Sequence, residues 1–230
     1  MNRYKGLLQA TCCLIAICCA ATAARPLLGQ GPPAAAAPPL QAGQVDAKLS
    51  RTYVLVGKTG LGHEHGVEGR LAGGRIQLGA PAKAGELVFD MTSFVAETAQ
   101  ARAVVGLQGE GSSAAQVTAN MLGPGVLNVA KFPEARFVIQ SALPLPAQQV
   151  GALPEYELQG EFTLRGVAQP LRIRAQASQK DGMVRLRGRF SILQTKFGIT
   201  PYKAALGAVG VADQLDIWGE IWLAGGPQGR

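Results

Sequence analysis

The two histidines of the chain are the side chains best placed to do chemistry, because they stand together in the segment 62–66, Gly-His-Glu-His-Gly. In a strand, His63 and His65 would point to the same side and could share one metal ion, for which zinc, copper and iron are candidates. A closed structural zinc site normally has four protein ligands, so further ligands would have to come from distant carboxylates such as Asp90 or Glu97. A metal site, and a metal-dependent enzyme built on it, is one hypothesis.

The glycines on both sides of the histidine pair favour a turn instead. In a turn, His63 and His65 would form a polar rim at the mouth of an apolar pocket, or would contact only water. The sequence shows no further catalytic constellation, since it has no phosphate-binding glycine loop and no G-x-S-x-G context around its candidate serines, Ser93, Ser112, Ser113 and Ser191. We therefore expect a protein that is not an enzyme.

The first 24 residues have the order of a secretory signal peptide. The basic residues Arg3 and Lys5 precede an apolar run at 14–20, and small residues follow at 20–24. We expect cleavage at the end of the small-residue segment, which makes the protein periplasmic or secreted. The alternative is an uncleaved membrane anchor, but the apolar run falls short of the roughly 20 residues that a spanning helix needs.

All four cysteines lie in the predicted leader (Cys12, Cys13, Cys18 and Cys19), so the exported chain would have no disulfide, zinc–thiolate site or cysteine nucleophile.

The rest of the chain divides into three further segments. Residues 25–44 are rich in proline and alanine, which predicts a disordered tether. Residues 45–224 are long enough for one domain with a real core, and residues 225–230 form a short tail.

Alternation of apolar and polar residues predicts antiparallel strands with one dry and one wet face. The pattern is clearest in two neighbouring runs, 155–165 and 171–178. Further strand-like runs, with turn signals between them, lie at 51–59, 70–78, 86–91, 135–141, 184–192 and 214–223. Asp181-Gly182 predicts a tight hairpin, because glycine tolerates the positive φ that a primed turn requires.

Helical spacing of apolar residues occurs only between about residues 97 and 122, where we expect two short helices. The segment 123–125, Gly-Pro-Gly, ends the second helix. About eight strands with one short helical insertion predict an all-β domain, either a single antiparallel barrel or a tightly curled sandwich. The dry face of such a closed sheet either fills a core or lines a cavity for an apolar ligand.

The chain is basic, with a formal net charge of +7. Five arginines alternate singly with apolar residues on the wet faces of strands: Arg172, Arg174, Arg185, Arg187 and Arg189. A basic stripe could hold nucleic acid or an anionic membrane. No exposed aromatic residues are interleaved among these arginines as stacking platforms, so we expect a solvated face and no nucleic-acid partner. Trp218 and Trp222 share the polar face of the last strand, where the chain either covers them or leaves a contact patch.

Several segments resemble the YceI-like family. Residues 160–171, GEFTLRGVAQPL, are similar to its signature G-x-L-T-[IL]-[RH]-G-V-[ST]-x-P. Residues 121–137, MLGPGVLNVAKFPEARF, are similar to its stretch L-x-S-x-x-F-[LF]-D-V-x-x-[YF]-P-x-A-x-F. The segments 69–71, 197–199 and 214–223 fit the first and last parts of the family pattern. The resemblance covers about residues 45–223.

The resemblance implies an exported, lipocalin-like antiparallel barrel that holds a polyisoprenoid quinone or another long amphiphile in a central apolar tunnel. It implies a carrier or storage protein, with a lipid-like small molecule as its partner and no enzyme cofactor. Transient contact with a membrane surface and a homodimer are both compatible with this role.

The carrier hypothesis assigns roles to twelve residues. Those expected to face the ligand from the barrel wall are Tyr53, Leu55, Phe89, Met91, Phe137, Tyr156, Leu158, Phe162 and Leu164. Those expected near the openings, where they would contact a head group, are His63, His65 and Tyr202. Besides the metal hypothesis, the remaining alternative is a ligand-free interaction module with a side-chain-filled barrel and Trp218 and Trp222 as its contact surface.

Overall fold

The computed structural model describes residues 40–109, 111, 113–147, 149–204, 206 and 208–225. The predicted leader, most of the predicted tether and the tail beyond residue 225 lie outside these residues. The elements, in chain order, are β1 (Arg51–Gly60), β2 (His65–Ile76), β3 (Gly85–Ala96), α1 (Ala99–Val105), α2 (Ala114–Leu122), β4 (Glu134–Pro144), β5 (Glu155–Leu164), β6 (Val167–Lys180), β7 (Met183–Leu193), a short 3₁₀ helix (Gln194–Phe197), β8 (Lys203–Ala204) and β9 (Val209–Ala224).

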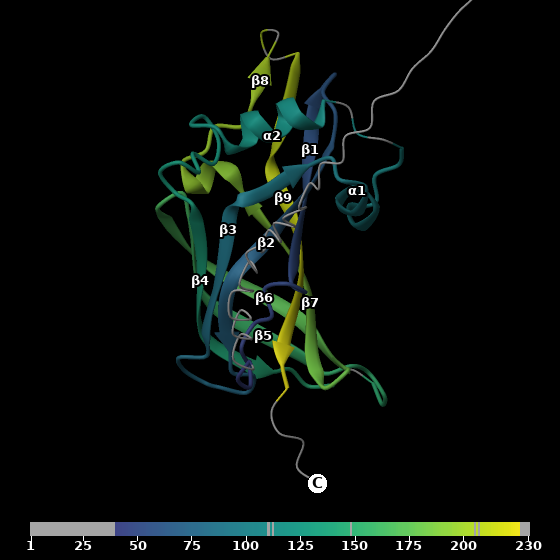
Figure 1. Ribbon diagram of the computed structural model, residues 1–230, viewed down its shortest axis with the longest axis vertical. Coiled ribbons are helices and arrows are strands. Elements are labelled where there is room, and N and C mark those ends of the chain that lie inside the picture. Colours follow the sequence, from purple (N-terminus) through teal and green to yellow (C-terminus); the bar gives the residue numbers. More distant parts are fainter. Residues whose placement is uncertain are drawn as a thin grey trace, which may run out of the picture. The chain divides into compact units, whose positions relative to one another are not determined.

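The strands form one antiparallel sheet that closes on itself (Figure 1). Strands β1 to β7 pair in sequence order, β7 pairs with β9, and β9 pairs back with β1. The two-residue strand β8 extends the sheet at one end of β9. Eight long strands therefore make a closed barrel, which confirms the predicted all-β barrel with a short helical insertion.

Two tight turns set the register of β5, β6 and β7. Lys180 pairs with Met183, so Asp181 and Gly182 alone connect β6 to β7, with φ of 52° and 74°. Positive φ at both positions is the signature of a type I′ turn, and the predicted hairpin is confirmed. Arg165 and Gly166 connect β5 to β6 in the same way, with φ of 52° and 76°.

The period-two pattern determines which side chains face the barrel interior. Along β6, Ile173, Ala175 and Ala177 are buried, whereas Arg172 and Arg174 between them are exposed. The outward arginines of the sheet meet carboxylates on neighbouring strands, as in the pair of Arg187 with Glu220 at 3.3 Å. The wet face predicted from the sequence is therefore the outer wall of the barrel.

The two helices lie at the same end of the barrel, between β3 and β4 in the chain (Figure 1). Helix α2 packs mainly against β3, and α1 packs against the outer side of β1 and β2. Neither helix in the described part of the chain has the length and apolar character that crossing a membrane requires.

Candidate ligand-binding cavity

The barrel interior is hollow towards the end that carries α2. An upper cavity of about 210 Å³ lies there, and a lower cavity of about 50 Å³ lies deeper in the barrel. The two cavities share five wall residues, which we call the waist: Thr52, Phe89, Phe162, Phe190 and Ile217. The ring of Phe162 stands edge-on to that of Phe89, with 6.0 Å between centroids. The cavities are thus successive parts of one apolar interior.

The mouth of the upper cavity lies under α2. Val117, Asn120 and Met121 of α2, with Val126 and Leu127 of the following loop, line the cavity from this side. No residue of α2 is fully buried, and its residues Val117, Met121 and Leu122 pack partly buried against the core. One hydrogen bond, from the Ala96 amide to the Thr118 hydroxyl at 3.0 Å, connects α2 to β3. The helix therefore covers this end of the cavity.

His65 contributes a polar group to the cavity wall, and buried partners hold its ring in place. Its Nδ1 lies 2.9 Å from Oε1 of Glu97, whose side chain is only 1% exposed. The other oxygen of Glu97 accepts a hydrogen bond from Arg102. Because Nδ1 is engaged by Glu97, Nε2 is the ring nitrogen that His65 can offer to a ligand.

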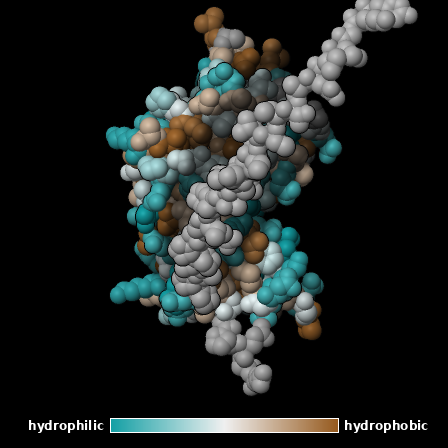
Figure 2. Space-filling view, viewed as in Figure 1, coloured by the Kyte–Doolittle hydropathy of each residue, from teal (hydrophilic) through white to brown (hydrophobic). Residues whose placement is uncertain are grey.

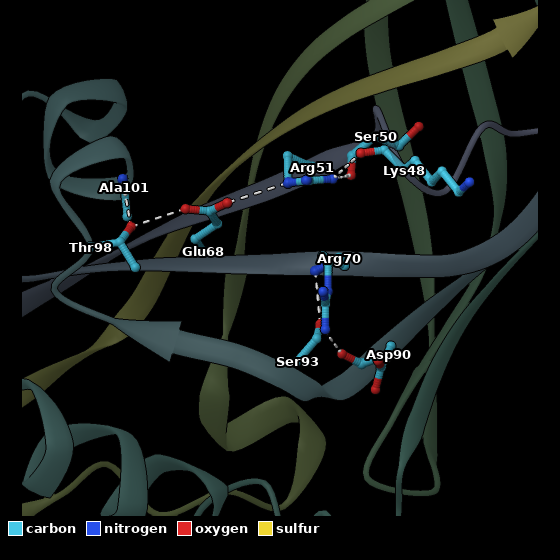
Figure 3. Close-up of polar contacts among 9 residues, drawn as sticks. All are labelled: Lys48, Ser50, Arg51, Glu68, Arg70, Asp90, Ser93, Thr98 and Ala101. Carbon is cyan, nitrogen blue, oxygen red and sulfur yellow. Dashed lines mark hydrogen bonds and ion pairs between the residues drawn. The ribbon is translucent and has the colours of Figure 1, made fainter. Parts of the chain in front are cut away.

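Polar contacts join the start of helix α1 to strands β2 and β1 (Figure 3). The Thr98 hydroxyl accepts from the Ala101 amide and so caps the helix, and it donates to Glu68 of β2 at 3.0 Å. Glu68 also pairs with Arg51 of β1 at 3.3 Å. This chain of contacts ties the start of α1 to two strands, which places Arg102 beside Glu97.

The sequence model of the YceI-like domain matches residues 44–221. The chain belongs to the YceI-like family. The family resemblance inferred from the sequence motifs is confirmed.

Solved structures are also similar to this chain. BcnA of Burkholderia cenocepacia is similar to it with a TM-score of 0.51 and 16% sequence identity, over 78% of this chain and 99% of BcnA. The YceI protein of Campylobacter jejuni has a TM-score of 0.43 and 11% identity, over 67% of this chain and 82% of that protein. No curated protein matches the chain. At 16% identity, the likeness to BcnA shows the fold alone.

Most of the predicted wall residues do face the interior of this YceI-like barrel. Phe89, Met91, Phe162 and Leu164 line the upper cavity, and Phe137 and Leu158 line the lower one. Tyr156 is half-buried against the core and borders neither cavity. Tyr202 is 49% exposed and lies at the mouth. Whether these residues bind a ligand remains a prediction.

The predicted inward orientation of Tyr53 and Leu55 is wrong. Both lie on the outer side of β1, where Tyr53 packs under α1 with Ala101 and Val105. Burial raises the pKa of the Tyr53 phenol, and a hydrogen bond with Gln100 offsets only part of this rise. The alternation misleads here because α1 covers the outer face, so the residues on both faces of β1 are largely apolar.

The two histidines do not form a pair. His63 is exposed in the turn before β2, whereas His65 begins β2 and lines the cavity. Asp90 pairs with Arg70 of β2, five residues along the strand from His65. Its carboxylate accepts hydrogen bonds from Thr92. Glu97, the other suggested ligand, is engaged by Arg102 as well as by His65. Within the part of the chain that the structure describes, no three histidine, cysteine or acidic side chains cluster as a metal site would require.

Sequence reasoning missed several wall residues. Thr52, Val54 and Val56 form the inward row of β1, and Phe190 and Ile217 complete the waist. The alternation of apolar and polar residues at 184–192 and 214–223 already indicated that Phe190 and Ile217 face inward. The inward row of β1 had no such signal, because its neighbours Tyr53 and Leu55 are equally apolar.

The two tryptophans of β9 are partly covered by arginines of β7. The Arg189 guanidinium lies 4.4 Å from the ring centroid of Trp218, and that of Arg185 lies 5.4 Å from Trp222. Such cation–π contacts reduce the aromatic surface available to a partner. Trp218 also packs beside Tyr53 under α1. The arginines therefore cover part of both tryptophan rings.

Proposed function

We propose that this YceI-like protein is an exported, non-catalytic carrier that binds one lipid-like amphiphile, such as a polyisoprenoid quinone, inside the barrel. The observation that supports the proposal is the apolar interior, in which two cavities share the waist residues and the polar side chains of His65, Asn120, Gln194 and Tyr202 lie at the α2 end. A tail in the barrel and a head group near His65 would match this distribution. Export rests on the leader-like residues 1–24.

The size of the cavity limits the ligand. Ligand pockets for drug-sized molecules usually enclose about 300 to 1,000 Å³, and the upper cavity encloses about 210 Å³. A slender chain or one small ring fits this space, and a longer tail would extend beyond it. Each 100 Å² of buried tail would contribute about 2.5 kcal/mol, so a chain can bind firmly with few polar contacts.

The rival hypotheses have less support. A metal-dependent enzyme would need ligands beside His65, but His63 points to solvent and Glu97 is held by Arg102. An interaction module would need a barrel filled with side chains and uncovered tryptophans. The barrel instead contains a cavity, and Arg189 lies over the ring of Trp218. Native mass spectrometry combined with organic extraction tests the carrier proposal, which requires one bound lipid-like molecule per chain.

We also propose that the mouth of the barrel touches a membrane surface when ligand is loaded. Leu61 is 81% exposed and Leu206 is fully exposed. The Leu61 amide donates to the carbonyl of Ala208, which places the turn after β1 beside the turn before β9. Figure 2 shows hydrophobic residues (brown) at this end. Lys58 and Lys203 pair with adjacent positions of β9 and place positive charge beside the leucines. An apolar tip with a basic rim suits an anionic lipid surface.

Replacing Leu61 and Leu206 together by serine should weaken binding to vesicles of phosphatidylglycerol and phosphatidylcholine about tenfold, because the apolar area that enters the interface is lost. Cosedimentation measures this. The matched control replaces Val150 and Leu153, which are exposed at the opposite end of the barrel, and should leave binding unchanged. Equal losses in both variants would contradict a membrane contact at the mouth.

A further inference from the structure

The barrel wall is hydrogen-bonded along only part of the boundary between β6 and β7. The ladder between these strands ends where Ala175 pairs with Gly188. Beyond that pair, among the residues that the structure describes, residues 167–174 of β6 pair with β5 alone and residues 189–193 of β7 pair with β9 alone. Side chains can therefore move apart at this boundary without breaking a backbone ladder.

Inward-facing side chains lose burial where this ladder ends. Ala175 and Leu186 are buried, whereas Leu171 and Phe190, which lie beyond the last pair on the same inward rows, are only half-buried. Both Leu171 and Phe190 line the lower cavity. We call the place between these two side chains the side gap. It is the part of the wall where a chain inside the barrel can reach the outside.

The side gap is bounded at both ends. Towards the mouth, the 3₁₀ helix packs against β6, and Gln169 donates to the carbonyl of Lys196 at 3.1 Å. Phe197 of this helix is buried and stands edge-on to Phe162, with 5.6 Å between ring centroids. Away from the mouth, the β6–β7 ladder begins. The gap is thus a short opening at the level of the lower cavity.

The far end of the barrel is filled with packed side chains. Ile76 and Phe137 line the lower cavity and are almost completely buried. Val45 packs into the same core from the segment before β1, and its amide donates to the carbonyl of Gly74 at 2.9 Å. The lower cavity encloses only about 50 Å³. A chain that passes the waist therefore has room to continue only sideways.

A larger groove, the outer groove, lies on the outside of the same part of the wall. It encloses about 460 Å³ and shares Ala175, Gly188 and Gly219 with the lower cavity. The two glycines add no side chain to the wall between the two spaces. Val104 of α1 and Trp218 of β9 contribute apolar surface to the outer groove, and three arginines and two glutamates also line it. Because these charges have both signs and arginine stems are apolar, the groove suits an apolar chain better than a charged group.

We propose that the ligand is a chain longer than the barrel interior, and that its distal end leaves through the side gap and lies in the outer groove. This inference rests on the carrier function and adds an outer half to its binding site. The head group lies near His65, and the chain runs through the waist, passes between Leu171 and Phe190, and ends against Val104 and Trp218.

Strand geometry gives the length at which the chain reaches the side gap. His65 lies opposite Val56, and Val56 is four residues from Thr52, which pairs with Gly219 at the outer groove. Four residues correspond to about 13 Å at roughly 3.3 Å per residue. An extended chain covers this distance with roughly ten carbon atoms. A decanoyl chain therefore stays inside the barrel, whereas an octadecanoyl chain reaches the outer groove.

Two photoreactive fatty acids test this path. Octadecanoic acid and decanoic acid, each with a diazirine next to the terminal methyl group, are cross-linked to the wild-type protein by light, and peptide mass spectrometry identifies the labelled residues. We expect the longer probe to label the outer groove around Val104 and Trp218, and the shorter probe to label the barrel interior. Labelling of α2 or of the interior alone by the longer probe would overturn the inference and leave the carrier function standing.

A charge in the outer groove provides a second readout. Val104 is 36% exposed, so Val104→Glu leaves the fold intact and places a carboxylate where the end of the chain lies. This variant should bind octadecanoic acid about fivefold more weakly and decanoic acid as the wild type does, because only the longer chain buries apolar area there. The matched control is Val138→Glu on the outer wall of β4, which should change neither affinity.

The affinities decide the inference independently of the cross-links. Wild-type affinity of Val104→Glu for octadecanoic acid would overturn it, as would equal losses for the two fatty acids. If neither fatty acid binds the wild type, the inference fails, and the carrier function stands only if an added isoprenoid quinone is taken up at one molecule per chain.

Discussion

Replacing Val56 by tryptophan should remove most ligand binding while the barrel stays folded. Val56 lies half-buried on the inner side of β1, opposite His65 of β2 and Leu215 of β9, and lines the upper cavity. An indole ring there would occupy much of the roughly 210 Å³ that the cavity offers. We expect the affinity for a quinone or fatty-acid probe to fall by about 30-fold or more, which corresponds to about 2 kcal/mol.

The matched control is Val138→Trp. Val138 belongs to β4 and is 48% exposed on the outer wall, so an indole ring there enters solvent and not the cavity. Titration with a fluorescent probe should give the control the affinity of the wild type. Wild-type affinity in Val56→Trp would place the binding site elsewhere, and equal losses in both variants would point to a general effect of tryptophan on the fold.

Arg102→Met should lower the stability of the domain more than a typical surface change. The Arg102 side chain is 13% exposed and pairs with Glu97, which is 1% exposed. Arg102 also donates to the carbonyls of Gln108 and Gly109 after α1. Without the guanidinium, the buried carboxylate of Glu97 keeps only His65 as a side-chain partner. Breaking a buried pair in this way costs about 3 kcal/mol or more and should lower Tm by roughly 6 to 12 °C in thermal unfolding.

Two further variants test the cause of this loss. Arg136→Met breaks ion pairs with Glu86 and Glu134 that are about half exposed, and it should leave Tm nearly unchanged. Adding Glu97→Gln to Arg102→Met removes the stranded carboxylate and should recover part of the lost stability. An unchanged Tm in Arg102→Met would contradict the view that Glu97 and Arg102 hold the polar side of the mouth.

The fold could be predicted where each strand has one wet face. In β5 and β6 the outer residues are charged and the inner ones apolar, so the period of two shows the orientation directly. Asp181 and Gly182 determined the hairpin because few residues adopt positive φ at both turn positions. The same reasoning placed Phe89, Phe162 and Leu164 correctly on the inner wall.

The site could be predicted only in part, because its details depend on tertiary contacts. Tyr53 is apolar enough to suit either face, and only the docking of α1 assigns it to the outside. His65 and Glu97 are 32 residues apart, so their hydrogen bond follows from the β2–β3 pairing and not from a local motif. The side gap has no sequence signature, because β6 and β7 keep their alternation beyond the point where their pairing ends.

Native mass spectrometry of the gently purified full chain, followed by organic extraction, tests the carrier function most directly. We expect one bound lipid-like molecule per chain, which organic solvent releases and an added isoprenoid quinone or fatty acid replaces at one molecule per chain. Val56→Trp should show neither the bound molecule nor the uptake. An empty wild-type barrel that also takes up no added quinone or fatty acid would contradict the carrier function.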